Sequence, residues 1–165
     1  MRITLLSSFL AAICMAWLLA TPPPASAFGP TGLGGKLGYM SPESHDGTLA
    51  VAAHMEFEQS GSRVHLIPNL MYWKAGDLSD LSANADLYYH FVPEGQIAPY
   101  VGAGLGINAF SSSNQSDTKL GVNLIGGFRF PAPAVHYFLE GRYTASDITQ
   151  FGLLGGITFH GWHAH

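Results

Sequence analysis

The stretch that decides the fold is Tyr100-Val101-Gly102-Ala103-Gly104-Leu105-Gly106-Ile107-Asn108-Ala109-Phe110. In an extended strand, successive side chains point to opposite faces. One face of this stretch is apolar, whereas the other holds glycines with Tyr100 and Asn108. A soluble sandwich would show a polar face to water, but glycines suit the crowded inside of a narrow barrel. The stretch therefore predicts a strand of an outer-membrane β-barrel, apolar outside and polar within.

The chain after residue 27 repeats this alternation between turn-forming segments. The predicted strands cover residues 34–40, 48–58, 63–73, 81–92, 97–110, 119–130, 135–144 and 148–159. A tilted transmembrane strand needs roughly 9 to 11 residues. The predicted outward rows of the second, fourth, sixth and eighth strands carry no charge. We predict an all-β fold, an eight-stranded antiparallel up-and-down transmembrane β-barrel over residues 28–159. A lipocalin-like barrel, with the apolar rows inside, is the alternative.

Two segments fit the pattern less well. Residues 32–38 are dense in glycine and include Lys36, so a flexible lead-in is an alternative to the first strand. Pro68 lies inside the third predicted strand and cannot donate a ladder hydrogen bond there. A bulge or a local break is therefore expected at Pro68.

The N-terminus has the features of a secretory signal. Arg2 is followed by an apolar run over residues 3–19, by three prolines at 22–24, and by Ala25-Ser26-Ala27. This order predicts a cleavable signal peptide over residues 1–27, with an uncleaved membrane anchor as the alternative. Cys14 follows Ile13, which is too large for a lipidation signal.

The composition excludes several classes of protein. Removing the signal peptide removes the only cysteine, so disulfides cannot stabilise the exported chain. The formal net charge is −4 and charged residues are 11% of the chain, without a basic patch that would bind nucleic acid. No segment after residue 27 could form a transmembrane helix, so any membrane integration is expected to use strands.

The connections fall into two alternating sets. Segments 59–62, 93–95 and 131–133 are short or proline-rich, and segments 41–47, 74–80, 111–118 and 145–147 are more polar. If the chain starts in the periplasm, these are periplasmic turns and surface loops respectively. Aromatic residues near the strand ends predict two interfacial girdles. The turn side would hold Phe57, Phe91, Tyr100, Phe130 and Phe159, and the loop side Tyr72, Phe110, Tyr143 and Phe151.

Strand parity collects polar side chains on the inward face. The predicted charge network is Glu56, Arg63, Asp86, Arg129, Glu140 and Arg142, and the other inward polar residues are His54, His65, His90, Asn108, Asn123 and His136. Because isolated buried charge is costly, these groups should pair. A plug of salt bridges is expected, with a narrow hydrophilic path as the alternative. No inward serine or cysteine accompanies a histidine as an activated nucleophile would, so we expect no catalysis.

Two further segments, a polar loop and the C-terminal tail, are candidate binding sites. The polar loop with Ser111, Ser113, Asn114, Gln115 and Asp117 is the candidate for an external partner, or else a solubilising loop. The tail 160–165 holds three histidines, which can bind zinc, copper or nickel. A flexible tail lacks fixed geometry, so we predict a solvated tail, no metal and no cofactor.

Three segments carry a family resemblance: 98–106 (APYVGAGLG), 126–130 (GGFRF) and 139–143 (LEGRY). With these the chain resembles the small outer-membrane β-barrel superfamily of the OmpA transmembrane domain, OmpX-like and OmpW-like proteins. The resemblance implies a place in the cell outer membrane, among lipid and lipopolysaccharide. It also implies barrel assembly machinery and periplasmic chaperones as partners in biogenesis, and a structural, surface-interaction or narrow-channel role. Six residues follow Phe159, whereas the family usually ends on that aromatic residue.

The fifth-strand motif is also similar to that of the lipid A deacylase PagL. That family carries a catalytic His-x-Ser near the end of the seventh strand. The corresponding stretch here is Arg142-Tyr143-Thr144-Ala145-Ser146, which contains no histidine. Without a base beside the serine, an active deacylase is not expected.

Overall fold

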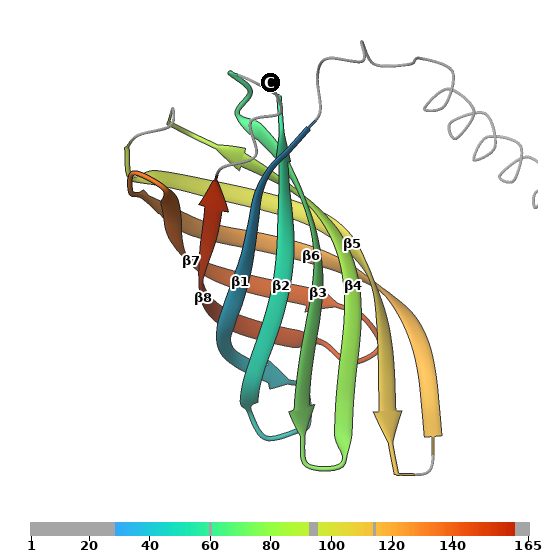
Figure 1. Cartoon of the computed structure of the whole chain (residues 1–165). Coiled ribbons are helices and arrows are strands. Elements are labelled where there is room, and N and C mark those ends of the chain that lie inside the picture. Colours follow the sequence, from blue (N-terminus) through green and yellow to red (C-terminus); the bar gives the residue numbers. More distant parts are fainter. Residues whose placement is uncertain (1–28, 60, 93–95, 114, 161–165) are drawn as a thin grey trace, which may run out of the picture.

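The computed structural model describes residues 29–59, 61–92, 96–113 and 115–160, and they form a closed antiparallel barrel (Figure 1). Its strands are β1 (Gly29–Pro42), β2 (Thr48–Glu58), β3 (Val64–Ala75), β4 (Leu78–His90), β5 (Ala98–Ser112), β6 (Gln115–Pro131), β7 (Val135–Ala145) and β8 (Gln150–His160). Each strand pairs with the next in sequence, and β8 pairs with β1 to close the barrel. The predicted eight-stranded fold is confirmed. Among the described residues, no helix is both long enough and apolar enough to cross a membrane.

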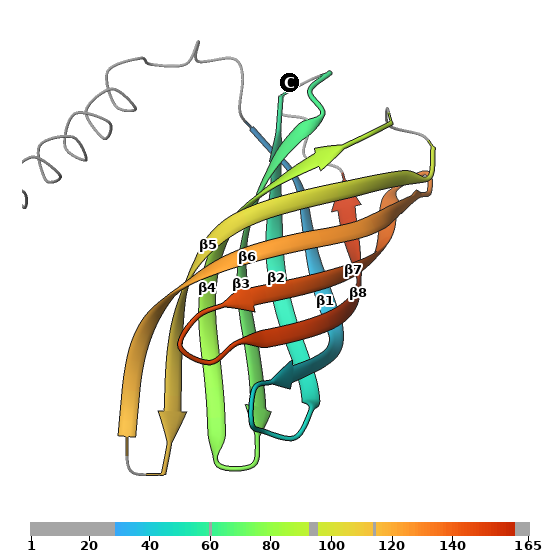
Figure 2. The ribbon, with the colours of Figure 1, turned by 180° about the vertical axis from the view of Figure 1, so that it is seen from behind.

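The barrel has two distinct ends, visible in Figure 1. At the terminal end, β1 begins and β8 ends, beside the connections 59–63, 91–97 and 132–134. At the loop end lie the connections 43–47, 76–77, 113–114 and 146–149. Figure 2 shows from behind that the β5–β6 hairpin runs further at the loop end than the β7–β8 hairpin.

Large apolar side chains cover the outside of the barrel. They alternate with buried residues along each strand because the side-chain period of a strand is two. In β4, for example, the odd-numbered residues from Leu81 to Tyr89 are exposed and the even-numbered residues from Asp80 to His90 are buried. Leu105, at the middle of β5, is 66% exposed. The apolar row therefore faces outward, which excludes the lipocalin-like alternative.

Inward-facing glycines make room for the side chains that fill the barrel. A Cβ at Gly104 would collide with the Asp86 carboxylate and with the backbone of Ala85. A Cβ at Gly38 would collide with the backbone of Leu153 and Leu154. Gly38 pairs with Leu154 of the adjacent β8 and Gly104 pairs with Asp86 of the adjacent β4, so glycine at these positions leaves room for the paired strand and its inward side chain.

Several predicted boundaries were wrong. The flexible lead-in is instead a continuous β1, whose residues from Gly32 to Met40 pair with both β2 and β8. Predicted loops 74–80 and 111–118 are mostly strand, with a turn of two residues at 76–77 and with β5 extending to Ser112 and β6 beginning at Gln115. Gly76 has φ 60°, the left-handed conformation that glycine allows. Where a hairpin extends beyond the lipid, polar residues can still pair as β-strand. The polarity of residues 74–80 and 111–118 therefore predicted loops where the structure has strand ends.

Pro68 interrupts the pairing on one side only. The β2–β3 register is the same above and below it, but Met55 and Glu56 have no paired partner in β3. The β3–β4 ladder continues through Pro68, which lies opposite Ala85. The expected local break therefore occurs toward β2, without a bulge, because proline has no N–H to donate.

The two aromatic girdles are only partly as predicted. Tyr100 and Phe110 are 3% and 6% exposed, so they point into the barrel. Both occupy inward positions of β5, where parity overrides their place near a strand end. Phe57 is half-buried. The other predicted members are exposed: Phe91, Phe130, Phe159, Tyr72, Tyr143 and Phe151.

Leu105→Arg should lower the free energy of unfolding in lipid vesicles by about 2–4 kcal/mol, because it places a charge on the apolar face at mid-barrel. Urea titration with tryptophan fluorescence measures this. Ser111→Arg at the loop end is the matched control and should cost much less. Equal effects of the two substitutions would contradict the assignment of the apolar face.

Candidate functional site

The candidate site is the polar interior, which has three layers along the barrel. Trp73, Met40 and Phe110 pack with Leu154 toward the loop end. A network of ionic and amide groups fills the middle, and a cluster of histidines lies at the terminal end. Strand alternation from all eight strands directs these side chains inward, so residues distant in sequence meet on the barrel axis.

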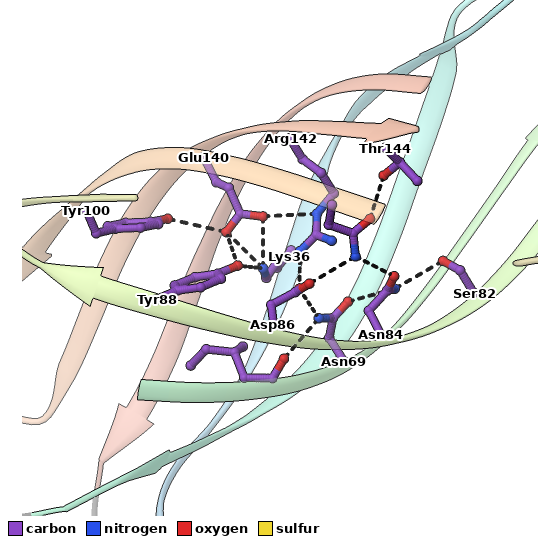
Figure 3. Close-up of polar contacts among 12 residues, drawn as sticks. Lys36, Asn69, Ser82, Asn84, Asp86, Tyr88, Tyr100, Glu140, Arg142 and Thr144 are labelled. Atoms are coloured by element: carbon purple, nitrogen blue, oxygen red, sulfur yellow. Dashed lines mark hydrogen bonds and ion pairs between the residues drawn. The ribbon is translucent and has the colours of Figure 1, made fainter. Parts of the chain in front are cut away.

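Glu140 on β7 is the centre of the middle layer (Figure 3). Lys36 Nζ donates to both of its carboxylate oxygens, at 3.0 and 2.9 Å. The hydroxyls of Tyr88 and Tyr100 donate to Oε2 at 2.6 and 3.3 Å. Arg142 Nε lies 3.4 Å from Oε1. Four donor groups make five contacts with this fully buried carboxylate, so its charge is well compensated.

Asp86 on β4 is the second anion of the layer. Arg142 Nη2 lies 2.6 Å from its Oδ2. The amide of Asn69 donates to Oδ2 at 2.7 Å and that of Asn123 to Oδ1 at 2.9 Å. Thr144 in turn donates to the Asn123 carbonyl at 2.9 Å. Arg142 therefore bridges the two carboxylates, and the two amides hold Asp86 on its remaining sides.

The middle layer is electrically balanced. Its two cations, Lys36 and Arg142, match its two anions, Asp86 and Glu140, and all four side chains are at most 1% exposed. Burying a charge is costly unless a partner and hydrogen bonds compensate it. The cluster is therefore interdependent, because removing one member leaves an opposite charge buried without its partner.

One member of the predicted charge network does not face inward. Arg63 is exposed, since it lies before the first residue of β3 and parity does not direct it inward. Lys36 provides the fourth central charge instead. Lys36 had no predicted site role because its glycine-rich segment also fitted a flexible lead-in. Its alternation with Gly34 and Gly38 was the signal that could have placed it inside. Tyr88, which had no predicted role, completes the Glu140 contacts.

A second cluster lies at the terminal end. His65 Nδ1 is 2.5 Å from Glu56 Oε1 and 3.2 Å from Glu58 Oε2. Arg129 Nη1 is 3.6 Å from the same Glu56 oxygen. The rings of His65 and His90 are 4.4 Å apart between centroids. Glu56 and Arg129 thus belong to this cluster and not to the middle network.

The remaining predicted inward residues are spread along the barrel. His54 bonds Thr158 Oγ1 at 2.9 Å, between the two clusters. His136 is half-buried, and its ring lies 4.0 Å from that of His160 at the terminal end. Asn108 is buried toward the loop end, where a Cβ added to Gly121 would meet its amide.

The predicted partner loop is a strand hairpin with a free edge. Ser111, Ser113, Gln115 and Asp117 are exposed, and Asn114 lies outside the described residues. Pairing of β6 with β7 begins only at Val122, so residues 115–121 pair with β5 alone. Lys119 Nζ sits 2.8 Å from Asp147 and 3.0 Å from Asp117. Hydrogen bonds to these carboxylates raise the pKa of Lys119, which keeps it charged.

The stretch compared with the deacylase motif has structural contacts. Thr144 is buried and bonds Asn123, while Ser146 lies in the β7–β8 connection. Its Oγ donates to the carbonyl of Ile148 at 2.8 Å. This hydrogen bond stabilises the turn and occupies the serine hydroxyl.

The lipid-facing exterior and the closed ladder define an outer-membrane β-barrel protein. Residues 10–165 match the family described as outer membrane protein beta-barrel domain, and the chain belongs to that family. It is therefore a protein of the bacterial outer membrane, surrounded by outer-membrane lipid. A search of curated protein sequences finds no significant match.

Solved structures share the fold at low sequence identity. The chain is similar to Neisserial surface protein A (NspA), with a TM-score of 0.67 and 16% identity over 84% of this chain and 100% of that one. For the N-terminal β-barrel domain of Pseudomonas aeruginosa OprF, the TM-score is 0.63 and the sequence identity is 14%, over 81% of this chain and 99% of that one. For the outer membrane enzyme PagL, the TM-score is 0.50 and the sequence identity is 15%, over 76% of this chain and 97% of that one. At these identities the likeness concerns the fold alone.

Glu140→Gln should lower the free energy of unfolding by about 3–5 kcal/mol, because Lys36 and Arg142 lose the carboxylate they share. Adding Lys36→Met should recover part of this loss, since one of the two stranded cations is removed. Urea titration of the single and double variants gives the free energy of interaction between Glu140 and Lys36. Asp117→Asn, in an exposed ion pair, is the control and should cause no measurable change. Additive losses in the double variant would contradict the shared network.

Proposed function

We propose that this protein is a non-enzymatic outer-membrane barrel, closed to ions, with a structural and surface-interaction role. The observation that carries the proposal is the balanced network of Lys36, Asp86, Glu140 and Arg142 across the middle of the barrel. A side chain held by several charge-assisted hydrogen bonds does not leave its position without losing all of them. The network therefore acts as a plug.

The apolar layer toward the loop end supports closure. Trp73 Nε1 donates to Gln150 at 2.9 Å, and Gln150 donates to Asp80 at 3.2 Å. Met40 and Leu154 are fully buried beside this chain of contacts. An ion entering from the loop end would have to lose its water against these side chains before it reached the plug.

The edge of the β5–β6 hairpin supports the surface role. A strand edge with unused N–H and C=O groups can pair with an extended segment of another protein. Residues 115–121 offer such an edge beyond the β7 ladder. NspA is called a surface protein, and the similar Yersinia pestis Ail is called an attachment invasion locus protein. Ail shares 15% identity and a TM-score of 0.54, so these names support a surface role without specifying a partner.

The proposed orientation places the terminal end in the periplasm and the hairpins outside. Residues 1–27 would be removed as a signal peptide on export, and residues 161–165, which follow β8, would stay in the periplasm. His160, which was predicted to belong to the tail, is the last residue of β8. Assembly machinery and periplasmic chaperones would then insert the barrel. We place no catalysis on Ser146, because its hydroxyl is used in the turn and position 144 is threonine.

In planar bilayers, the refolded protein should show no discrete conductance, because the plug occupies the barrel axis. The double variant Glu140→Ala with Arg142→Ala should produce conductance steps, since it removes two of the side chains that fill the centre. Heat-shifted migration on gels confirms that each sample is folded, and boiled protein is the negative control. Discrete steps from the unsubstituted protein would favour the narrow-pore alternative instead.

Shortening the β5–β6 hairpin should abolish attachment of cells to surfaces while leaving the barrel assembled. The variant joins Ala109 to Thr118, which are paired partners, through Asn-Gly. Its level in the outer membrane should be unchanged by gel shift. The control replaces Gly76-Asp77 with Asn-Gly and keeps its hairpin length. Cells that carry either variant could attach as well as cells that carry the full chain, while cells without the protein do not attach. In that case the hairpin is not the interaction surface.

A further inference from the structure

We propose that the cluster at the terminal end is a binding site for a divalent transition-metal ion of the Zn²⁺ class, with Glu56, His65 and His90 as ligands. One carboxylate oxygen and one nitrogen from each imidazole lie within 4.8 Å of one another. The three side chains come from β2, β3 and β4, so three adjacent strands hold them. All three residues are at most 5% exposed.

The donor set matches the chemistry of these ions. Imidazole nitrogen and carboxylate oxygen bind Zn²⁺ at about 2.0–2.2 Å, so the three donors, which lie within 4.8 Å of one another, have to gather around one ion. Small rotations of the His90 and Glu56 side chains would bring the donors to that spacing. His90 Nδ1 is buried and makes no hydrogen bond in the described structure. An ion would satisfy this nitrogen, which otherwise pays the cost of burial without a partner.

Charge and shape around the three ligands favour an ion. Glu56 Oε1 is held by His65 and approached by Arg129 at 3.6 Å, while Oε2, which lies 3.8 Å from His160 Nε2, is the oxygen that would reach the ion. Arg129 would orient the carboxylate, as outer partners of metal ligands do. Its single positive charge is opposed by Glu56 and Glu58, so a dication enters a site of net negative charge. A cavity of about 30 Å³ beside Glu56 and His90 has room for a water as a fourth ligand.

The ordinary alternative is a buried ion pair between Glu56 and His65 with no ion. In that case the nearby His90 only fills space, and its imidazole nitrogen contributes nothing to metal affinity. His54 is a suitable comparison, because it is also buried but bonds Thr158 and lies outside the three-ligand group. The two explanations therefore differ in what each histidine substitution does to metal binding.

The test is a Zn²⁺ titration of the refolded barrel in detergent against a chromophoric chelator. All proteins carry His163→Ala and His165→Ala, which remove competing donors in the tail. One ion should bind per chain, and His90→Ala should weaken binding by at least about tenfold. His54→Ala should leave the affinity unchanged. Heat-shifted migration shows that each variant is folded.

A second measurement uses the unsubstituted ligands, so it does not depend on variant folding. Co²⁺ added in place of Zn²⁺ should give visible absorption bands of a four-coordinate site, and one equivalent of Zn²⁺ should remove them. Unsaturable binding, no such bands, or equal affinity for the His90→Ala and unsubstituted ligand sets would overturn the proposal. Equal losses in the His54 and His90 variants would also overturn it, because the effect would then be structural.

Discussion

Closure of the hydrogen-bonded ladder is the constraint on which the rest of the structure depends. Backbone N–H and C=O groups inside a bilayer have no water to bind, so a spanning sheet must have no free edge. Pairing of β8 with β1 removes the last two edges. The break at Pro68 is confined to two residue pairs, and the register is unchanged across it. The edge left open, along residues 115–121 of β6, lies at the loop end, where water can satisfy its polar groups.

Closing a narrow barrel creates the second problem, which is how to fill its inside. Eight strands leave space for side chains but not for a wide channel. Glycines at positions such as Gly38 and Gly104 leave room for the neighbouring paired strand and for large polar side chains such as that of Asp86. Polar groups placed there are out of contact with bulk water, so they have to satisfy one another. The Glu140 and Asp86 contacts meet that demand with two cations and several amides, which stabilises the interior and is the basis of the plug that we propose.

The terminal end follows a different principle. Its histidines and Glu56 are not matched one to one as the central charges are, and His90 keeps a buried nitrogen without a hydrogen bond. Polar groups left partly satisfied in a folded protein often mark a site that serves something other than stability. The proposed plug therefore lies in the middle of the barrel, and the proposed ion site lies at its terminal end.

The sequence by itself determined the signal-like N-terminus, the eight strands, their outward rows and the polar character of the inside, because side-chain alternation depends only on local geometry. It also placed Asp86, Glu140 and Arg142 on the inward face. Only the tertiary structure decided which inward residues meet. The barrel register brings Lys36 to Glu140, 104 residues away, and Glu56 to His65 and His90. It excluded Arg63, whose strand begins one residue later than expected. Strand pairing across the chain sets these contacts, and no single segment contains that information.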